Sequence, residues 1–89
     1  MPTISAFYGI ISYLYFFDNR KYRIPHFHAR YQGQQAVVSI FDGEVLDGEI
    51  PAPKMRLVQA WLEIHREEVL ADWELAVTGQ TPLPIAPLC

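Results

Sequence analysis

The hydrophobic period of this sequence changes once, at the prolines of residues 51–53, and that change limits the fold more than any other feature. Before it, short runs of aromatic and β-branched residues alternate with turn residues, as in β-strands. After it, apolar residues recur at spacings of three and four over residues 53–78, and Pro53 suits the first turn of a helix. The pattern does not decide whether residues 53–78 form one helix or two separated near His65. We predict an α+β domain, in which an antiparallel meander of three or four strands carries a C-terminal helical segment packed on one face.

Turn residues divide the first part of the chain into candidate strands. Residues 7–17 carry no charge and place apolar side chains on both alternating faces, which predicts one inner strand with a bend or bulge at Gly9. Asp42-Gly43 predicts a type I′ hairpin turn, because this dipeptide accepts positive φ at both positions. The expected strands are residues 7–17, 26–31, 35–41 and 44–46, the last extending at most to residue 49.

Composition places the chain among small folded proteins of a reducing compartment. With 89 residues and 51% hydrophobic side chains, it can form one domain, which we assign to residues 1–81, followed by an extended Pro-rich tail over residues 82–89. The single cysteine, Cys89, excludes an intramolecular disulfide. The uncharged run of residues 1–17 is shorter than a membrane-spanning helix needs. We therefore expect a cytoplasmic protein that does not enter a membrane.

Charge is distributed unevenly along the chain. The formal net charge is −3, which does not support a nucleic-acid partner, although basic residues gather in the first part. Such a group can meet an acidic partner or the acidic second part of the same chain, and we expect the latter. The basic residues concerned are Arg20, Lys21, Arg23 and Arg30.

Residues 25–30, Pro-His-Phe-His-Ala-Arg, hold two of the three histidines of the chain. Successive side chains of a strand point to opposite faces of a sheet, so this segment has a polar face and an apolar face. We expect the apolar face in the core and treat the polar face as a candidate site. The polar face carries His26, His28 and Arg30, and the apolar face carries Phe27, Ala29 and Tyr31.

Two imidazoles on one strand face can share a divalent metal ion, provided that further ligands arrive from elsewhere. His26 and His28 are the candidate ligands, and His65 is the third histidine that could join them. His65 also lies within the apolar stripe of the helical segment, where a histidine bonded to backbone or carboxylate is expected instead. In the plainer alternative, His26 and His28 are polar residues on the exposed face of a half-buried strand. Acidic candidates for a further ligand are Asp18, Asp42 and Glu44.

The same histidines are candidates for acid–base catalysis. Histidine titrates near neutral pH, so His26 or His28 could exchange a proton with a substrate, and a neighbouring cation could stabilise an anionic transition state. Metal-independent ribonucleases combine these groups. The cations available are Arg30, Arg23 and Lys21, and the binding candidates of the face are His26, His28, Arg30 and Arg23.

Several motifs occur together along nearly the whole chain: Met1-Pro-Thr-Ile-Ser5, Phe7-Tyr-Gly9, Tyr15-Phe16 before an aspartate, Pro25-His-Phe-His-Ala29 with Tyr31, Trp61…His65-Arg66-Glu67-Glu68…Trp73-Glu74-Leu75, and Ile85-x-Pro87-Leu88. In combination they resemble the bacterial domain-of-unknown-function family 4160 (DUF4160). The resemblance implies a small cytoplasmic protein, encoded beside another small protein in an arrangement similar to a toxin–antitoxin pair. Many members carry an Asp-His pair after the first strand, whereas here Asn19 follows Asp18.

The polar strand face and the resemblance lead to two functional hypotheses. In the first, the protein is a protein-binding component of a toxin–antitoxin-like module, with a nearby-encoded small protein as partner and a homodimer as an alternative assembly. In the second, it is a metal-dependent hydrolase or a ribonuclease that uses the His-x-His strand. Whether it is an enzyme is left open, and a divalent metal is the cofactor that the histidines would suit.

Overall fold

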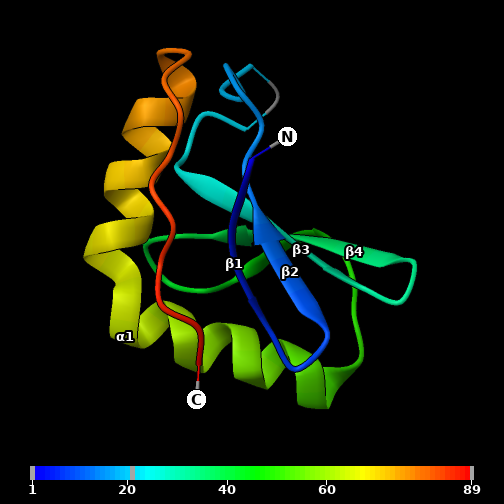
Figure 1. The fold of residues 1–89 in the computed structure, drawn as a ribbon. Helices are drawn as coiled ribbons and strands as arrows, with labels where there is room; N and C mark the ends of the chain where they lie inside the picture. The colour runs from blue at the N-terminus through cyan, green and yellow to red at the C-terminus, as the bar shows by residue number, and fades with distance from the viewer. Residues whose placement is uncertain (1, 21, 89) are drawn as a thin grey trace.

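The computed structural model describes residues 2–20 and 22–88, so the expectations placed on Met1, Lys21 and Cys89 lie outside the described residues. The fold is an antiparallel five-stranded sheet with strand order β1-β2-β3-β4-β5, followed by one helix, α1 (Figure 1). The α+β class is confirmed, and the expected three or four strands are corrected to five. The elements are β1 (Thr3–Phe7), β2 (Ile10–Tyr13), β3 (His26–Tyr31), β4 (Gln34–Ser39), β5 (Val45–Gly48) and α1 (Ala52–Val77).

The additional strand comes from residues 7–17, where the prediction of one long inner strand was wrong. The chain reverses at Tyr8-Gly9, and β1 and β2 pair as a hairpin with Phe7 opposite Ile10. Tyr8 and Gly9 both have positive φ, 50° and 78°, the conformation of a type I′ turn. Tyrosine rarely adopts positive φ, so the residue types at Tyr8-Gly9 do not predict a turn there.

A second correction concerns Asp42-Gly43. Gly43 has φ 73°, but Asp42 is not among the residues with positive φ, so a two-residue type I′ turn does not form there. A longer connection over residues 40–44 joins β4 to β5, and the Ser39 N–H donates to Glu44 O at 2.9 Å. The type I′ geometry occurs instead at Gln32-Gly33, with φ 47° and 83°, between β3 and β4. The ends of β4 and β5 consequently differ from those expected, whereas β3 covers the six residues predicted.

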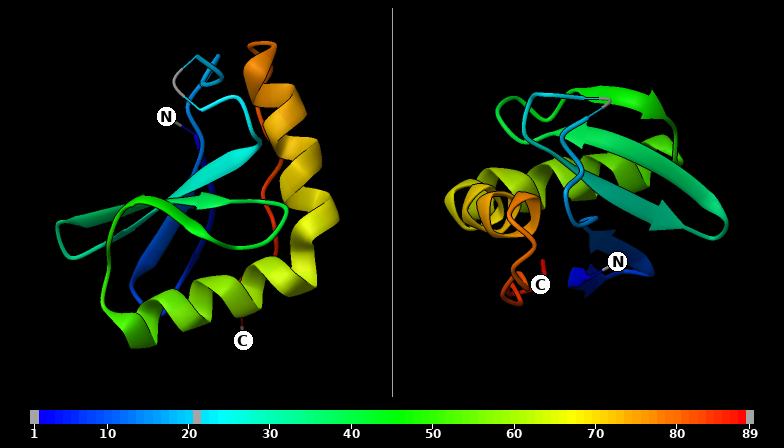
Figure 2. Two further views of the ribbon diagram at one scale, coloured as in Figure 1. Left: turned by 180° about the vertical axis from the view of Figure 1, so that it is seen from behind. Right: turned by 90° about the horizontal axis from the view of Figure 1, so that it is seen from above.

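The helix α1 covers one face of the sheet and bends at His65. That residue has φ −114° and ψ 19°, outside the helical region, so two straight segments meet there and give the helix an L shape (Figure 2). The helix ends in a Schellman motif, in which Gly79 (φ 81°) donates to Ala76 O and Gln80 donates to Leu75 O. No helix within the described residues combines the length and apolar character that a membrane crossing requires.

The hydrophobic core lies between the sheet and both segments of α1. Trp61 is fully buried, and its ring lies 5.7 Å from the ring of Phe27 on β3 and 5.5 Å from that of Phe7 on β1. Side chains of this size contribute most to the burial of apolar surface. Other core residues with 0% exposure are Ile10, Ala29, Val38, Ile40, Val58, Leu62, Val69 and Ala76.

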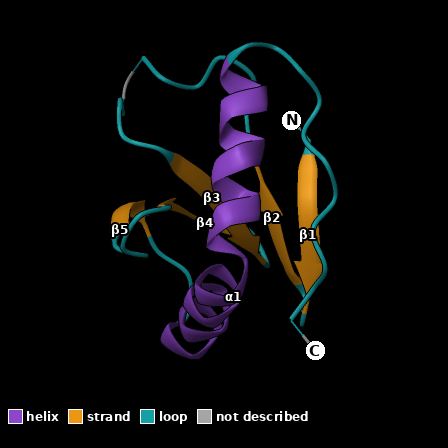
Figure 3. Cartoon of the chain, turned by 90° about the vertical axis from the view of Figure 1, so that its left-hand side faces the viewer, coloured by secondary structure: helices purple, strands orange, loops and turns teal. Residues whose placement is uncertain are grey.

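The C-terminal segment of residues 80–88 forms no helix or strand and runs beside β1 (Figure 3). Beyond Gln80, it is attached by hydrogen bonds from Ile85 N–H to Ile4 O at 2.7 Å, from Trp61 Nε1 to Ala86 O at 2.9 Å, and from Leu83 N–H to the Asp72 carboxylate at 2.9 Å. Burial raises the pKa of Asp72. The Pro-rich tail therefore packs across its own domain.

Candidate functional site

The two faces of β3 have different surroundings. Phe27 and Ala29 belong to the hydrophobic core, so the alternation of the strand directs His26, His28 and Arg30 to the opposite face. The register confirms this arrangement across the sheet, because His28 pairs with Tyr13 of β2 and Val37 of β4. The polar and apolar faces expected from the sequence are therefore present.

Asp18 reaches this face from the segment that follows β2. The Phe17 N–H donates to Ala76 O at the end of α1, and Phe17 has φ 56°, an uncommon conformation for a bulky residue. The aromatic ring of Phe17 lies against Gly79, where an added Cβ would be only 2.6 Å from Cζ of the ring. The end of the helix thus holds the backbone immediately before Asp18 and turns that side chain back toward the sheet.

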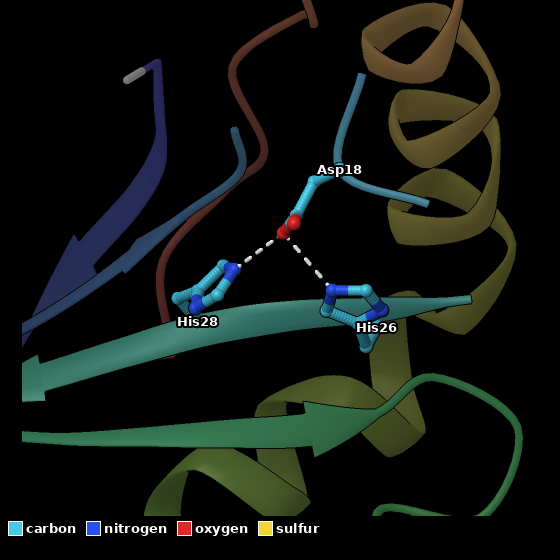
Figure 4. A group of neighbouring side chains, drawn as sticks. All are labelled: Asp18, His26 and His28. Atoms are coloured by element: carbon cyan, nitrogen blue, oxygen red, sulfur yellow. Dashed lines mark hydrogen bonds and ion pairs between the residues drawn. The ribbon is translucent and has the colours of Figure 1, made fainter. Parts of the chain in front are cut away.

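One carboxylate oxygen of Asp18 contacts both strand histidines (Figure 4). Asp18 Oδ2 lies 2.9 Å from His26 Nε2 and 2.7 Å from His28 Nε2. The exposed fractions of the side chains are 0% for His26, 12% for His28 and 26% for Asp18. The other nitrogen of His26, Nδ1, lies 2.9 Å from the carbonyl oxygen of Ile24. We call Asp18, His26 and His28 the Asp-His-His cluster.

Aromatic rings surround the Asp-His-His cluster. The ring of Tyr13 stacks on His28 with centroids 5.2 Å apart, and Tyr15 meets His28 edge-on at 4.6 Å. His26 lies between Trp73 of α1, at 4.7 Å, and Tyr22, at 5.5 Å. Contacts from three separate parts of the chain therefore fix the two imidazole planes.

Burial changes the titration of two groups at this face. It lowers the pKa of His28, and the neighbouring Asp18 only partly opposes that effect. Burial also raises the pKa of Tyr13 to about 12, assisted by Tyr15 and opposed by the positive charge of Arg30. His28 is thus favoured as a neutral imidazole, the form that accepts a proton or binds a metal, and Tyr13 keeps its phenolic proton at neutral pH.

Arg30 occupies the same face next to the cluster. Its guanidinium carbon lies 5.6 Å from the ring centroid of Tyr13, and the Tyr13 hydroxyl donates to Gln35 Oε1 at 3.1 Å. A hollow of about 180 Å³ lies beside His28 and includes Gln35 and Asp47 in its lining. Chemically, the face combines proton-exchanging imidazoles, a cation and room for a small group.

The structure brings together some of the sequence-predicted site residues and separates others. Of the acidic candidates, only Asp18 joins the histidines, and the group of described residues whose donor atoms lie within 4.8 Å of one another is Asp18, His26 and His28. His65, a predicted third ligand, is therefore replaced by Asp18. It lies at the helix kink, 14% exposed, with Nδ1 2.8 Å from Glu68 Oε1. The contact of His65 with a carboxylate was expected, but its expected position in the hydrophobic core was not confirmed.

The remaining differences follow from contacts between distant segments. His26 is fully buried, so the alternative that placed both histidines on an exposed face was wrong for this residue. Arg23 is exposed on the connection to β3. Sequence reasoning missed Tyr13, Tyr22 and Trp73 as neighbours of the histidines, and only the strand register and the course of α1 would have indicated them.

Comparison with known proteins identifies a family but supplies no activity. A family model described as "Domain of unknown function (DUF4160)" matches residues 9–74, which include the Asp-His-His cluster and most of α1. No curated protein and no solved structure matches the chain.

Proposed function

The chain belongs to the family described as domain of unknown function (DUF4160), and on that premise we propose that it is a protein-binding component of a bacterial toxin–antitoxin-like module. The partner is a small protein encoded nearby, and both act in the cytoplasm. The surface that would bind it includes the polar face of β3 and the segment that leads to Asp18.

Exposed aromatic side chains next to the Asp-His-His cluster carry this proposal. Tyr15, Phe16 and Phe17 are consecutive and have exposed fractions of 39%, 41% and 60%. Ile24, on the connection that enters β3, is 46% exposed. Large apolar side chains that gather at one surface are typical of interaction sites, and aromatic residues are enriched in them.

Charge indicates the kind of partner. Arg20 and Arg23 are exposed on the connection between β2 and β3, and Arg30 is half-buried on the face itself. Exposed cations beside aromatic residues favour an acidic partner and raise the rate of its association. The partner we propose is therefore a small acidic protein.

Co-expression with the small protein encoded beside it tests the proposal. We expect a complex that survives purification, and a growth effect when one component is induced alone. Phe16→Ser should weaken the complex, because it removes exposed apolar surface without touching the core. Ile64→Ser, which alters a 66% exposed side chain on α1, is the matched control and should leave the complex unchanged. Absence of both a complex and a growth effect would contradict the proposal, as would a homodimer that excludes the partner.

A second candidate, an enzyme, is favoured by the sharing of Asp18 between two histidines. A histidine beside a carboxylate can act as a general base, and Arg30 could stabilise an anionic transition state. The reaction would be a hydrolysis, metal-dependent or of ribonuclease type. Incubation of RNA with the wild-type protein and with His28→Gln tests the ribonuclease hypothesis. Cleavage by the wild type alone would support it, and intact RNA in both incubations would exclude it.

A further inference from the structure

Both ring nitrogens of the buried His26 face oxygen acceptors. Nδ1 lies 2.9 Å from the carbonyl oxygen of Ile24, which can only accept, and Nε2 lies 2.9 Å from Asp18 Oδ2. A neutral imidazole has one N–H, so in either tautomer one nitrogen lone pair would face an oxygen lone pair. A metal ion between Nε2 and the carboxylate would satisfy both nitrogens, because Nδ1–H could then donate to Ile24 O.

The position of Ile24 O indicates which nitrogen would bind a metal. A histidine that ligates a metal through one nitrogen usually donates its other N–H to a carbonyl or carboxylate, which fixes the tautomer and the ring orientation. Here Nδ1 is placed to donate to Ile24 O, and Nε2 points to Asp18. The ring is held further by Trp73 at 4.7 Å.

His28 brings a second nitrogen donor to the same oxygen. Its Nε2 lies 2.7 Å from Asp18 Oδ2, and all three donor atoms of the cluster lie within 4.8 Å of one another. Donors bound to one ion at about 2.1 Å in tetrahedral geometry are separated by roughly 3.4 Å. The two separations from Asp18 Oδ2 would have to widen by about 0.5 and 0.7 Å to admit an ion, chiefly through movement of Asp18, the most exposed of the three side chains.

We propose that Asp18, His26 and His28 form a binding site for one divalent first-row transition-metal ion of the zinc and ferrous-iron class. Two imidazole nitrogens and one carboxylate oxygen match the donor preferences of these ions. Calcium and magnesium take oxygen ligands instead, and copper(I) prefers sulfur, so the donor set argues against them. With three protein ligands, the ion would have at least one further position, reached from the side where Asp18 is 26% exposed.

Metal titration of the untagged, chelator-stripped protein tests this site. We expect one zinc ion per chain by calorimetry, a higher melting temperature with zinc, and visible absorption bands when cobalt(II) is added. Asp18→Asn and His28→Gln should each weaken zinc binding by more than about 100-fold, which is the upper end of the loss seen when only an outer partner of a ligand is changed. These variants spare His26, whose side chain is fully buried, so that a change of fold does not obscure the change in binding.

His65→Gln is the matched control, because this histidine also contacts a carboxylate, that of the 57% exposed Glu68, but lies outside the Asp-His-His cluster. It should bind zinc as the wild type does, and circular dichroism should show that all variants are folded. Zinc below stoichiometry in the wild type would overturn the proposal, as would equal zinc affinity in Asp18→Asn and His65→Gln. Capture of the partner protein with and without chelator separates this proposal from the proposed function, since either can fail while the other holds.

Discussion

The two faces of β3 are built from the same six residues, yet they depend on different parts of the chain. On one face Phe27 and Ala29 pack against α1, in a core where many apolar contacts contribute to stability. On the other face His26 and His28 depend on one carboxylate, from Asp18, and on the segment that positions it. The core face should therefore govern stability, and the polar face should govern binding. The variants below test that division, from the largest expected effect to the smallest.

Truncation on the core face should have the largest effect on stability. Phe27 is fully buried and contacts Trp61, so Phe27→Ala should lower the free energy of unfolding by about 3–5 kcal/mol, through lost burial and a cavity. Denaturant titration would measure it. Phe41→Ala, at a 58% exposed position, should change stability by less than about 0.5 kcal/mol. Similar losses in both variants would mean that the core face is not the main source of stability.

Removing the carboxylate should affect both stability and the site. In metal-free protein, Asp18→Ala leaves the buried His26 Nε2 without its partner, so we expect a loss of about 1–3 kcal/mol. Asp18→Asn retains an acceptor and should lose less. Urea titration in the presence of a chelator gives both values. A fully stable Asp18→Ala protein would show that the cluster contributes nothing to folding.

Two glycines allow the positioning of Asp18 to be tested at matched backbone cost. Gly79 and Gly33 have φ of 81° and 83°, so alanine at either should cost about 1–2 kcal/mol. A Cβ at Gly79 would also meet the Phe17 ring, whereas a Cβ at Gly33 meets nothing within 4 Å. Gly79→Ala should therefore be the less stable variant by thermal unfolding and should also weaken zinc binding. Equal stability and equal zinc affinity in the two variants would show that the end of α1 does not position Asp18.

Acidification should weaken the polar face of the metal-free protein. The folded state lowers the pKa of His28, so it binds fewer protons there than the unfolded chain. The free energy of unfolding should then fall as the pH drops below about 6.5, the ordinary value for histidine, while carboxylates of ordinary pKa stay ionised down to about pH 5. Urea midpoints across this window would measure the slope. His28→Gln should flatten it, and an unchanged slope would assign it to another group.

The smallest effect is expected at the other histidine–carboxylate pair. Glu68 is 57% exposed beside His65, so solvent screens their interaction. His65→Gln should change the free energy of unfolding by less than about 0.5 kcal/mol in chemical denaturation. A larger loss would show that His65 stabilises the helix bend as well as contacting Glu68.

Much of the fold could be predicted because its signals are local. Strand β3 was expected over the residues where it occurs, and α1 begins and ends within one residue of the predicted 53–78 segment. Turn positions were harder. Asp42-Gly43 has the composition of a type I′ turn but belongs to a longer connection, and Tyr8-Gly9 forms one without that composition. The apolar run of residues 7–17 consequently passed for a single strand.

The candidate site was only half predictable for the same reason. His26 and His28 share a face because strand geometry alternates side chains, and the sequence by itself determines that. It could not select Asp18 from Asp42, Glu44 and His65, because the choice depends on where segments distant in sequence meet. The contact of Phe17 with the end of α1 directs Asp18 to the histidines, and the helix kink leaves His65 beside Glu68. Local periodicity decided the two faces of β3, and only tertiary packing decided which carboxylate completes the polar one.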